Sequence, residues 1–217
     1  MNFAAARFNM VEGQIRTNRV INPAVVSALA EIPRENFVPK PMRGFAYVDE
    51  DLDLGNGRCL IEPLALARMV EAAAVTADDV VLNIGDACGY STAVLAKLAQ
   101  TVVSLECDGD LVAKATTALN DLSIDNAAMV QGPLDQGYPG QAPYDVILFS
   151  GAVAEIPLSI CRQLSDGGRL VAIVDNGRGM GRGTLVVRVG DTWGRRQVFD
   201  ACIPLLPGFA ESKKFVF

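Results

Sequence analysis

The stretch that decides the fold is DVVLNIGDACGYSTAVLAKLAQ, residues 79–100. Its first part, 79–85, is an apolar run that predicts a buried strand ending in glycine, and 89–100 has the spacing of a helix. A strand that passes through a glycine turn into a helix N-terminus lets backbone N–H groups and the helix dipole face a ligand. The unit therefore predicts a parallel α/β fold with a ligand site at the carboxyl end of this strand.

The same alternation continues on both sides of this unit. Further strands are predicted at 101–107, 127–132, 144–151 and 167–175, and further helices at 63–75, 109–122 and 155–164. Strands that are apolar throughout, with helices between them, indicate a mostly parallel sheet with helices on both faces. After a glycine-rich turn at 176–184, the segments 184–190 and 195–203 predict an antiparallel hairpin, and 213–217 closes the chain. We expect a Rossmann-like α/β fold with an antiparallel C-terminal edge.

The first 62 residues follow a different pattern. Helical spacing is found at 5–17 and 22–31, three prolines at 33–42 indicate irregular chain, and the glycine-rich 51–58 indicates a surface loop. Arg34 and Glu35 are expected to form a local surface pair. Because no repeat or low-complexity segment occurs, we expect 1–217 to form a single domain, with 1–62 as a helical and loop extension packed on an α/β core, 63–217.

The composition excludes several classes of function. The chain has no histidine, which removes Ser–His and Cys–His catalysis and the usual zinc ligands, and its five cysteines are too widely spaced for a Cys₄ site, so no metal is expected. The net charge of −6 argues against general affinity for nucleic acid. No apolar run approaches the roughly 18 residues that span a bilayer, and no leader pattern opens the sequence, so we expect a cytoplasmic protein without membrane contact.

The glycine loop narrows the choice of ligand. Its frame is G-x-A-x-G, formed by Gly85, Ala87 and Gly89, and Tyr90 stands where a dinucleotide-binding loop would have another glycine. Glu106 ends the next predicted strand, where a carboxylate accepts hydrogen bonds from ribose hydroxyls. The spacing suits S-adenosylmethionine, which has no pyrophosphate, better than NAD. The alternative is a fold that keeps this shape without the ligand.

Several separate blocks of the chain resemble the protein-L-isoaspartate O-methyltransferase family. The blocks occur in the family's order: MVEGQIRTNRVINPAVVSALAEIPRENFVP (10–39), AYVDEDLDLGNG (46–57), VLNIGDACGYSTAVLA (81–96), PYDVI (143–147), QLSDGGRLV (163–171) and CIPLLPG (202–208). The resemblance implies an S-adenosylmethionine-dependent methyltransferase fold. It also implies methyl transfer from S-adenosylmethionine to the carboxyl group of isoaspartyl residues, so that the partner is a damaged protein or peptide. We expect a monomer.

The family's substrate-binding positions are altered here. Its Thr-Ile-Ser triplet corresponds to Cys59, Leu60 and Ile61, so that both hydroxyls are missing. Glu62 adds a negative charge next to them, and Arg58 offers a guanidinium that suits a carboxylate partner. The resemblance also implies that Asp49 lines the substrate cleft, and a solvated acid in the run 49–53 is an equal alternative.

The cofactor positions implied by the resemblance are also changed. The family's acid after the first strand is Asn83, its threonine is Asp86, its middle glycine is Ala87 and its serine is Cys88. Asn83 is expected to face the methionine amino group, with Asp86 restoring the charge, and Ala87 fits only with a negative φ. The family's Gly-Asp-Gly is Gly-Pro-Leu at 132–134, which leaves Asp135 as the replacement acid. Gly85, Gly89, Tyr90 and Glu106 are retained.

Three hypotheses follow from these residues. The chain is a divergent isoaspartyl carboxyl methyltransferase, a methyltransferase for another acceptor, or a non-catalytic binding or regulatory protein that keeps the fold. A carboxylate attacking a sulfonium needs no strong base, which suits a chain without histidine. If a nucleoside binds, Glu106→Ala is expected to weaken its binding.

Overall fold

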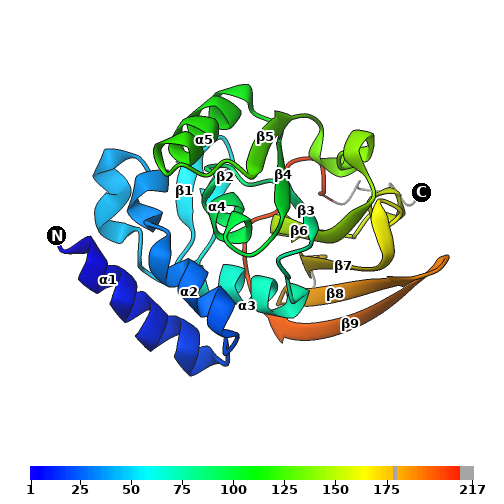
Figure 1. Cartoon of the computed structure of the whole chain (residues 1–217), viewed down its shortest axis with the longest axis horizontal. Coiled ribbons are helices and arrows are strands. Elements are labelled where there is room, and N and C mark those ends of the chain that lie inside the picture. The colour runs from blue at the N-terminus through cyan, green and yellow to red at the C-terminus, as the bar shows by residue number, and fades with distance from the viewer. Residues whose placement is uncertain (178–179, 211–217) are drawn as a thin grey trace.

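The computed structural model describes residues 1–177 and 180–210 and shows a three-layered α/β arrangement around a seven-stranded sheet (Figure 1). The strand order is β5-β4-β3-β6-β7-β8-β9. The strands are β3 (Val80–Ile84), β4 (Thr101–Glu106), β5 (Ala127–Gln131), β6 (Tyr144–Val153), β7 (Leu164–Val174), β8 (Arg182–Val189) and β9 (Thr192–Asp200). The first five in spatial order pair in parallel, and the β7–β8 and β8–β9 pairs are antiparallel, which confirms the predicted fold class.

Six α-helices are found in the described part of the chain. They are α1 (Phe3–Met10), α2 (Pro23–Glu31), α3 (Pro63–Ala73), α4 (Tyr90–Ala96), α5 (Gly109–Asp121) and α6 (Leu158–Cys161). None of these helices is both long and apolar enough to cross a membrane. The helix predicted at 155–164 is wrong in extent: only one short turn forms, because Pro157 starts it late and β7 begins at Leu164.

The sheet is buried on both sides because its strands are apolar throughout. Alternate residues of β3 and β6 fall into two hydrophobic clusters: Val81 and Val146 pack on one side, Leu82 and Ile147 on the other. The first cluster includes side chains of α1, α2, α3 and α4, so the N-terminal segment and the parallel sheet share a core. The second is completed by α6 and by the segment after β9, which contributes Leu206.

The N-terminal region differs from the sequence prediction in two places. The helix predicted at 5–17 is α1 followed by a π-helical turn (Val11–Ile15) and a 3₁₀ turn (Arg16–Asn18). The expected loop at 51–58 is part of a hairpin, β1 (Leu52–Gly55) and β2 (Arg58–Leu60). Its turn contains Asn56 and Gly57, both with positive φ, as a tight hairpin turn requires. The Asn-Gly pair was the signal for this hairpin.

Two further segments were predicted from the sequence. The irregular chain expected at 33–42 forms short 3₁₀ turns at Arg34–Phe37 and Lys40–Phe45. The hairpin predicted near the C-terminus is confirmed as β8 and β9, which form the lower edge of the sheet in Figure 1. The closing segment 213–217 lies outside the described residues.

The order of the strands creates a crevice at the centre of the sheet. The chain passes from β3 to β4 and β5 on one side, and then crosses to β6 on the other side of β3. In open α/β sheets, ligands bind beyond the carboxyl ends of the strands at such a reversal. Gly85 directly follows β3, and Gly151 lies near the end of β6. The residues around these two glycines therefore define the candidate site.

At the opposite end of β3, Asp79 forms an ion pair with Arg169 of β7, with 2.6 Å between Oδ2 and Nη2. Burial by itself would raise the pKa of Asp79, but hydrogen bonds from Arg169 and from the backbone N–H of Thr76 hold it below its usual value. We predict that Arg169→Ala lowers the free energy of unfolding by about 2 kcal/mol, measured by urea denaturation at pH 7.

The pH dependence checks the sign of this contribution. A carboxyl group with a depressed pKa stabilises the fold above its unfolded-state pKa of about 4, and this stabilisation is lost as the pH falls through the folded-state value. The difference between the wild type and Arg169→Ala should therefore shrink below about pH 4. An equal difference at pH 3 and pH 7 would show that the charge of Asp79 is not responsible.

Candidate functional site

Glu106 lies at the carboxyl end of β4, as predicted, and its side chain is fully buried. Its partner is Arg58 of β2: Nη2 lies 2.5 Å from Oε2, and Nε lies 3.3 Å from Oε1. Oε1 also accepts from the backbone N–H groups of Cys107 and Asp108, at 2.8 and 3.2 Å. Both carboxylate oxygens are therefore engaged by groups of the chain itself.

The loop after β3 is held by Asp86. Its Oδ1 accepts from the backbone N–H of Gly89 at 3.0 Å, and its Oδ2 accepts from the backbone N–H and the hydroxyl of Thr92 at 2.7 and 2.6 Å. The buried Asn83 belongs to the same network, because its amide donates to Ser91 and Thr92. Gly85 and Gly89 have φ of +82° and +90°, values that L side chains rarely adopt. Ala87 is not among the residues with positive φ, so its methyl group is tolerated.

Leu206 lies directly on the two glycines of the crevice. A Cβ placed on Gly85 would come within 2.5 Å of the Leu206 side chain, and one placed on Gly151 within 2.4 Å. The segment is fixed by two backbone hydrogen bonds with Ala152, from Leu206 N to Ala152 O (2.8 Å) and from Ala152 N to Pro204 O (2.9 Å). The space that glycine provides for a close approach is used here by a side chain of the same protein.

The segment at 59–61 is buried or half-buried and carries no reactive group. Leu60 and Ile61 are buried in the core, and Cys59 is half-buried. Burial, reinforced by the carboxylate of Asp51, raises the pKa of the Cys59 thiol to about 12, so the thiol is protonated at neutral pH. This segment therefore supplies neither a nucleophile nor a strong hydrogen-bond donor.

Three carboxylates surround the start of α3. Asp49 accepts from Leu64 N at 3.0 Å, and Asp51 accepts from Glu62 N at 2.8 Å, so both satisfy N–H groups at this helix end. Burial, together with the charges of Asp49 and Asp51, raises the pKa of Glu62 to about 7. The region is acidic and changes its charge near neutral pH.

Arg34 and Glu35 are buried, and the expected surface pair is wrong. Arg34 donates to the carbonyl oxygens of Ala46 (2.6 Å) and Ile61 (2.5 Å), and its guanidinium stacks over the ring of Tyr90. Glu35 is instead hydrogen bonded to the Tyr47 hydroxyl. Arg34 thus links the N-terminal segment to the residues that precede α3. Its position next to Glu35 in the sequence does not indicate these partners.

Comparison with known proteins places this arrangement in a family. The family model described as protein-L-isoaspartate(D-aspartate) O-methyltransferase (PCMT) matches residues 6–194. The chain belongs to this family. It is 41% identical over 170 residues to protein-L-isoaspartate O-methyltransferase 1 of Rhodopseudomonas palustris, covering 78% of this chain and 69% of the relative. It is 40% identical over 174 residues to protein-L-isoaspartate O-methyltransferase of Methanoregula boonei, covering 80% of both chains.

Solved structures in the PCMT family have the same fold. A protein-L-isoaspartate O-methyltransferase superimposes with a TM-score of 0.82 at 24% identity, covering 94% of this chain and 67% of the other. A second, from Plasmodium falciparum and in complex with S-adenosyl-L-homocysteine, gives a TM-score of 0.78 at 17% identity, with coverage of 95% and 98%. These similarities extend over nearly the whole chain and establish the PCMT fold.

The residues expected from the PCMT pattern fall into two groups in space. One group lies at the carboxyl ends of β3 and β4 and at the start of α4: Asn83, Gly85, Asp86, Ala87, Gly89, Tyr90 and Glu106. Asn83 and Asp86 point into their own hydrogen-bond network, which uses the groups that were expected to face a ligand. Asp135 is exposed, in a 3₁₀ turn after β5, and its Cβ would lie 3.7 Å from a Cβ on Gly208. Asp49 is half-buried and accepts from Leu64 N at the start of α3, and its place in a substrate cleft stays a prediction.

In this structure the carboxylate of Glu106, expected as the acceptor for ribose hydroxyls, is paired with Arg58, and the side chain of Leu206 lies against Gly85. The sequence identified Arg58 as a partner for a substrate carboxylate. The partner is instead Glu106, which lies 48 positions away in the chain.

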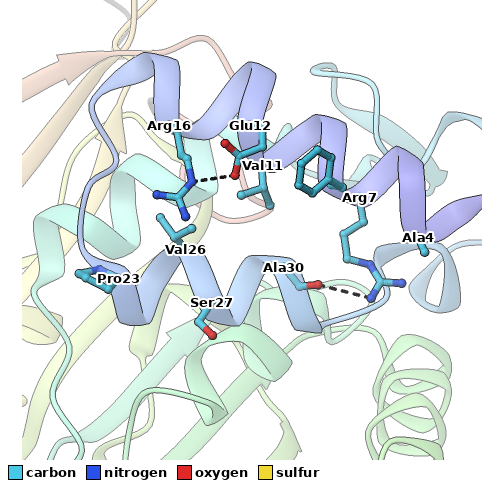
Figure 2. Close-up of a pocket in the computed structure, with 10 residues that line it drawn as sticks. Ala4, Arg7, Val11, Glu12, Arg16, Pro23, Val26, Ser27 and Ala30 are labelled. Carbon is cyan, nitrogen blue, oxygen red and sulfur yellow. Dashed lines mark hydrogen bonds and ion pairs between the residues drawn. The ribbon is translucent and has the colours of Figure 1, made fainter.

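Of the hollows in the described part of the chain, two differ in how close they lie to the glycine loop. One, of about 430 Å³, lies between α1 and α2 and is lined by residues that include Arg7, Val11 and Arg16, the last paired with Glu12 (Figure 2). None of its lining residues belongs to the glycine loop or to β2. The other, of about 420 Å³, borders the loop at Ala87 and Cys88 and is mainly apolar. Only the second is close enough to the loop to concern the candidate site.

The Asp86 network yields a stability prediction. In Asp86→Ala, the buried N–H groups of Gly89 and Thr92 lose their acceptor, so we expect the free energy of unfolding to fall by about 3 kcal/mol in urea denaturation. Asp121→Ala, at the exposed C-terminal end of α5, is the control and should change it by less than about 0.5 kcal/mol. A loss at Asp86 no larger than at Asp121 would show that the loop does not depend on this carboxylate.

Proposed function

We propose that this chain is a protein-L-isoaspartate O-methyltransferase that methylates the carboxyl group of isoaspartyl residues in damaged proteins, with S-adenosylmethionine as the methyl donor. The match of the family model to residues 6–194 carries this proposal. Relatives at 40–41% identity bear this enzyme name, and the homologous fold from Plasmodium falciparum holds S-adenosyl-L-homocysteine. When bound, S-adenosylmethionine supplies a methyl group activated by a sulfonium.

Methyl transfer to a carboxylate requires few catalytic groups from the chain's own side chains. The acceptor carboxylate is itself the nucleophile, so no general base is needed, in keeping with the absence of histidine. What the protein must supply is alignment of the acceptor and exclusion of water. The buried Leu60 and Ile61 suit the second task, whereas the protonated Cys59 and the acids at the start of α3 do little to hold an anion.

A non-catalytic binding or regulatory protein is the second candidate. The observation that favours it is the buried pair of Arg58 and Glu106, which engages the acceptor that a ribose would need. In a protein that no longer binds the cofactor, the buried Glu106 would still need a donor, and Arg58 supplies one. The location in the cytoplasm and the monomeric state stay predictions from the sequence.

Methyl transfer separates the two candidates. Purified protein is incubated with S-adenosylmethionine labelled in the methyl group and with an isoaspartyl peptide, next to the same peptide containing normal aspartate. We expect base-labile label on the isoaspartyl peptide alone. Two results together would support the non-catalytic candidate instead. The isoaspartyl peptide would carry no label, and calorimetry would detect no binding of S-adenosylhomocysteine at ligand concentrations that saturate an authentic relative.

Glu62 gives the reaction an expected pH dependence. Because its pKa is raised to about 7, Glu62 is largely neutral at pH 6 and charged at pH 8, where it repels an acceptor carboxylate beside 59–61. The KM for the isoaspartyl peptide should rise about threefold between these pH values, a modest factor because solvent and salt screen the charge. In Glu62→Gln this rise should disappear, while Glu155→Gln, an exposed control, should retain it.

The same shift affects folding in a defined direction. A carboxyl group with a raised pKa favours the fold while it is protonated, and this contribution is lost as the pH rises from about 4.5 to 7. Glu62→Gln should therefore be more stable than the wild type at pH 8 and lose this advantage at pH 4.

For the methylation reaction, the same change of KM with pH in the wild type and in Glu62→Gln would show that Glu62 does not face the acceptor.

A further inference from the structure

Arg58 occupies the position between the ends of two central strands. From β2 its Nη2 donates to the carbonyl oxygen of Gly85, which follows β3, at 2.6 Å, and to Glu106, which ends β4, at 2.5 Å. The Arg58 side chain is only 4% exposed, and that of Glu106 is 0% exposed. A guanidinium thus bridges the two elements that enclose a ligand at the centre of an open α/β sheet.

The hydrogen bonds of Glu106 show which donors its carboxylate already has. Oε1 accepts from two backbone N–H groups, which keep the carboxylate aimed at the crevice, while Oε2 has Arg58 as its partner. A ribose presents two neighbouring hydroxyl donors to such a carboxylate, and the fork of a guanidinium presents its N–H donors with similar spacing. A ribose that approached Oε2 would therefore compete with Arg58 for the same oxygen.

Leu206 closes the neighbouring part of the same crevice. Its side chain rests on Gly85 and Gly151 at distances where any added Cβ would collide, and it belongs to the hydrophobic cluster that includes Phe149 and Phe209. Arg58 and Leu206 thus both contact residues at the carboxyl ends of the central strands, where open α/β sheets bind ligands.

We propose that Arg58 is an internal ligand of the nucleoside site, which S-adenosylmethionine or S-adenosylhomocysteine must displace from Glu106 in order to bind. This inference rests on the proposed function, since it assumes that a nucleoside is the natural occupant. The apparent dissociation constant is then the intrinsic one divided by the fraction of molecules in which Arg58 has left. Arg58 sets the affinity for the cofactor and does not take part in the reaction.

Removal of the guanidinium should reveal the intrinsic affinity. We expect Arg58→Ala to bind S-adenosylhomocysteine at least about tenfold more tightly than the wild type in isothermal titration calorimetry at pH 7.5. Arg58→Lys keeps the charge but not the fork, and should fall between the two proteins. Arg169→Ala removes a comparable arginine from an ion pair at the other end of β3, and should leave the affinity unchanged.

A measurement on the wild type alone keeps the inference testable if Arg58→Ala does not fold. The Nε–H group of Arg58 has a buried partner, so its NMR signal should be resolved in the free protein and should shift or disappear on saturation with S-adenosylhomocysteine. The Nε–H signal of Arg169, which donates to Ala73 O, should not move.

In thermal denaturation, Arg58→Ala should unfold at a midpoint about 10 °C below that of the wild type. S-adenosylhomocysteine should restore a larger part of the lost midpoint temperature in Arg58→Ala than in Arg169→Ala.

The outcomes separate this inference from the proposed function. An unchanged affinity in Arg58→Ala, or an unmoved Arg58 signal at saturation, overturns the role of Arg58, whereas methylation of the isoaspartyl peptide in the same preparations still supports the enzyme. Tighter binding in Arg58→Ala without methylation by either protein supports the role of Arg58 and overturns the enzyme. Failure of both proteins to bind S-adenosylhomocysteine at about 1 mM overturns both proposals.

Discussion

The buried ion pair of Arg58 and Glu106 is the interaction on which this structure depends most. Neither charge is exposed to solvent, and an unpaired charge in such a place costs several kcal/mol, so each requires the other. The pair also joins two parts of the chain, because Arg58 comes from the N-terminal hairpin and Glu106 from the parallel sheet. A hairpin that is short and, by itself, weak is thereby fixed over the ends of β3 and β4.

The same constraint explains why the site differs from the pattern of its family. A carboxylate at the end of β4 that is held by backbone N–H groups needs a donor on its remaining side, whether from a ligand or from the chain. Here the chain supplies it. Asp86 follows the same principle, because a carboxylate inside the loop is satisfied by Gly89 and Thr92 and the loop is held rigid from within. The changes seen in the sequence are consistent with one another once their partners are known.

The fold was predictable to a large extent, and the site only in part. Apolar strands and helical spacing predicted β3 to β9 and most helices, because burial on both faces of a parallel sheet leaves a signal in each segment separately. The hairpin at 52–60 was missed because its strands are short and partly polar, although Asn56 and Gly57 signalled a turn. Gly85 and Glu106 were placed correctly from the strand ends, but the partner of Arg58 was not.

The sequence by itself determined the family, the fold class, the positions of the strands and the identity of the residues at their carboxyl ends, since these follow from local pattern and from blocks in a fixed order. Only the tertiary structure decided what those residues contact. The pairing of Arg58 with Glu106, the burial of Arg34 against Tyr90 and the placement of Leu206 on Gly85 each join segments far apart in the chain. Such contacts depend on the packing of the whole chain, so no local pattern records which donor reaches a buried acceptor.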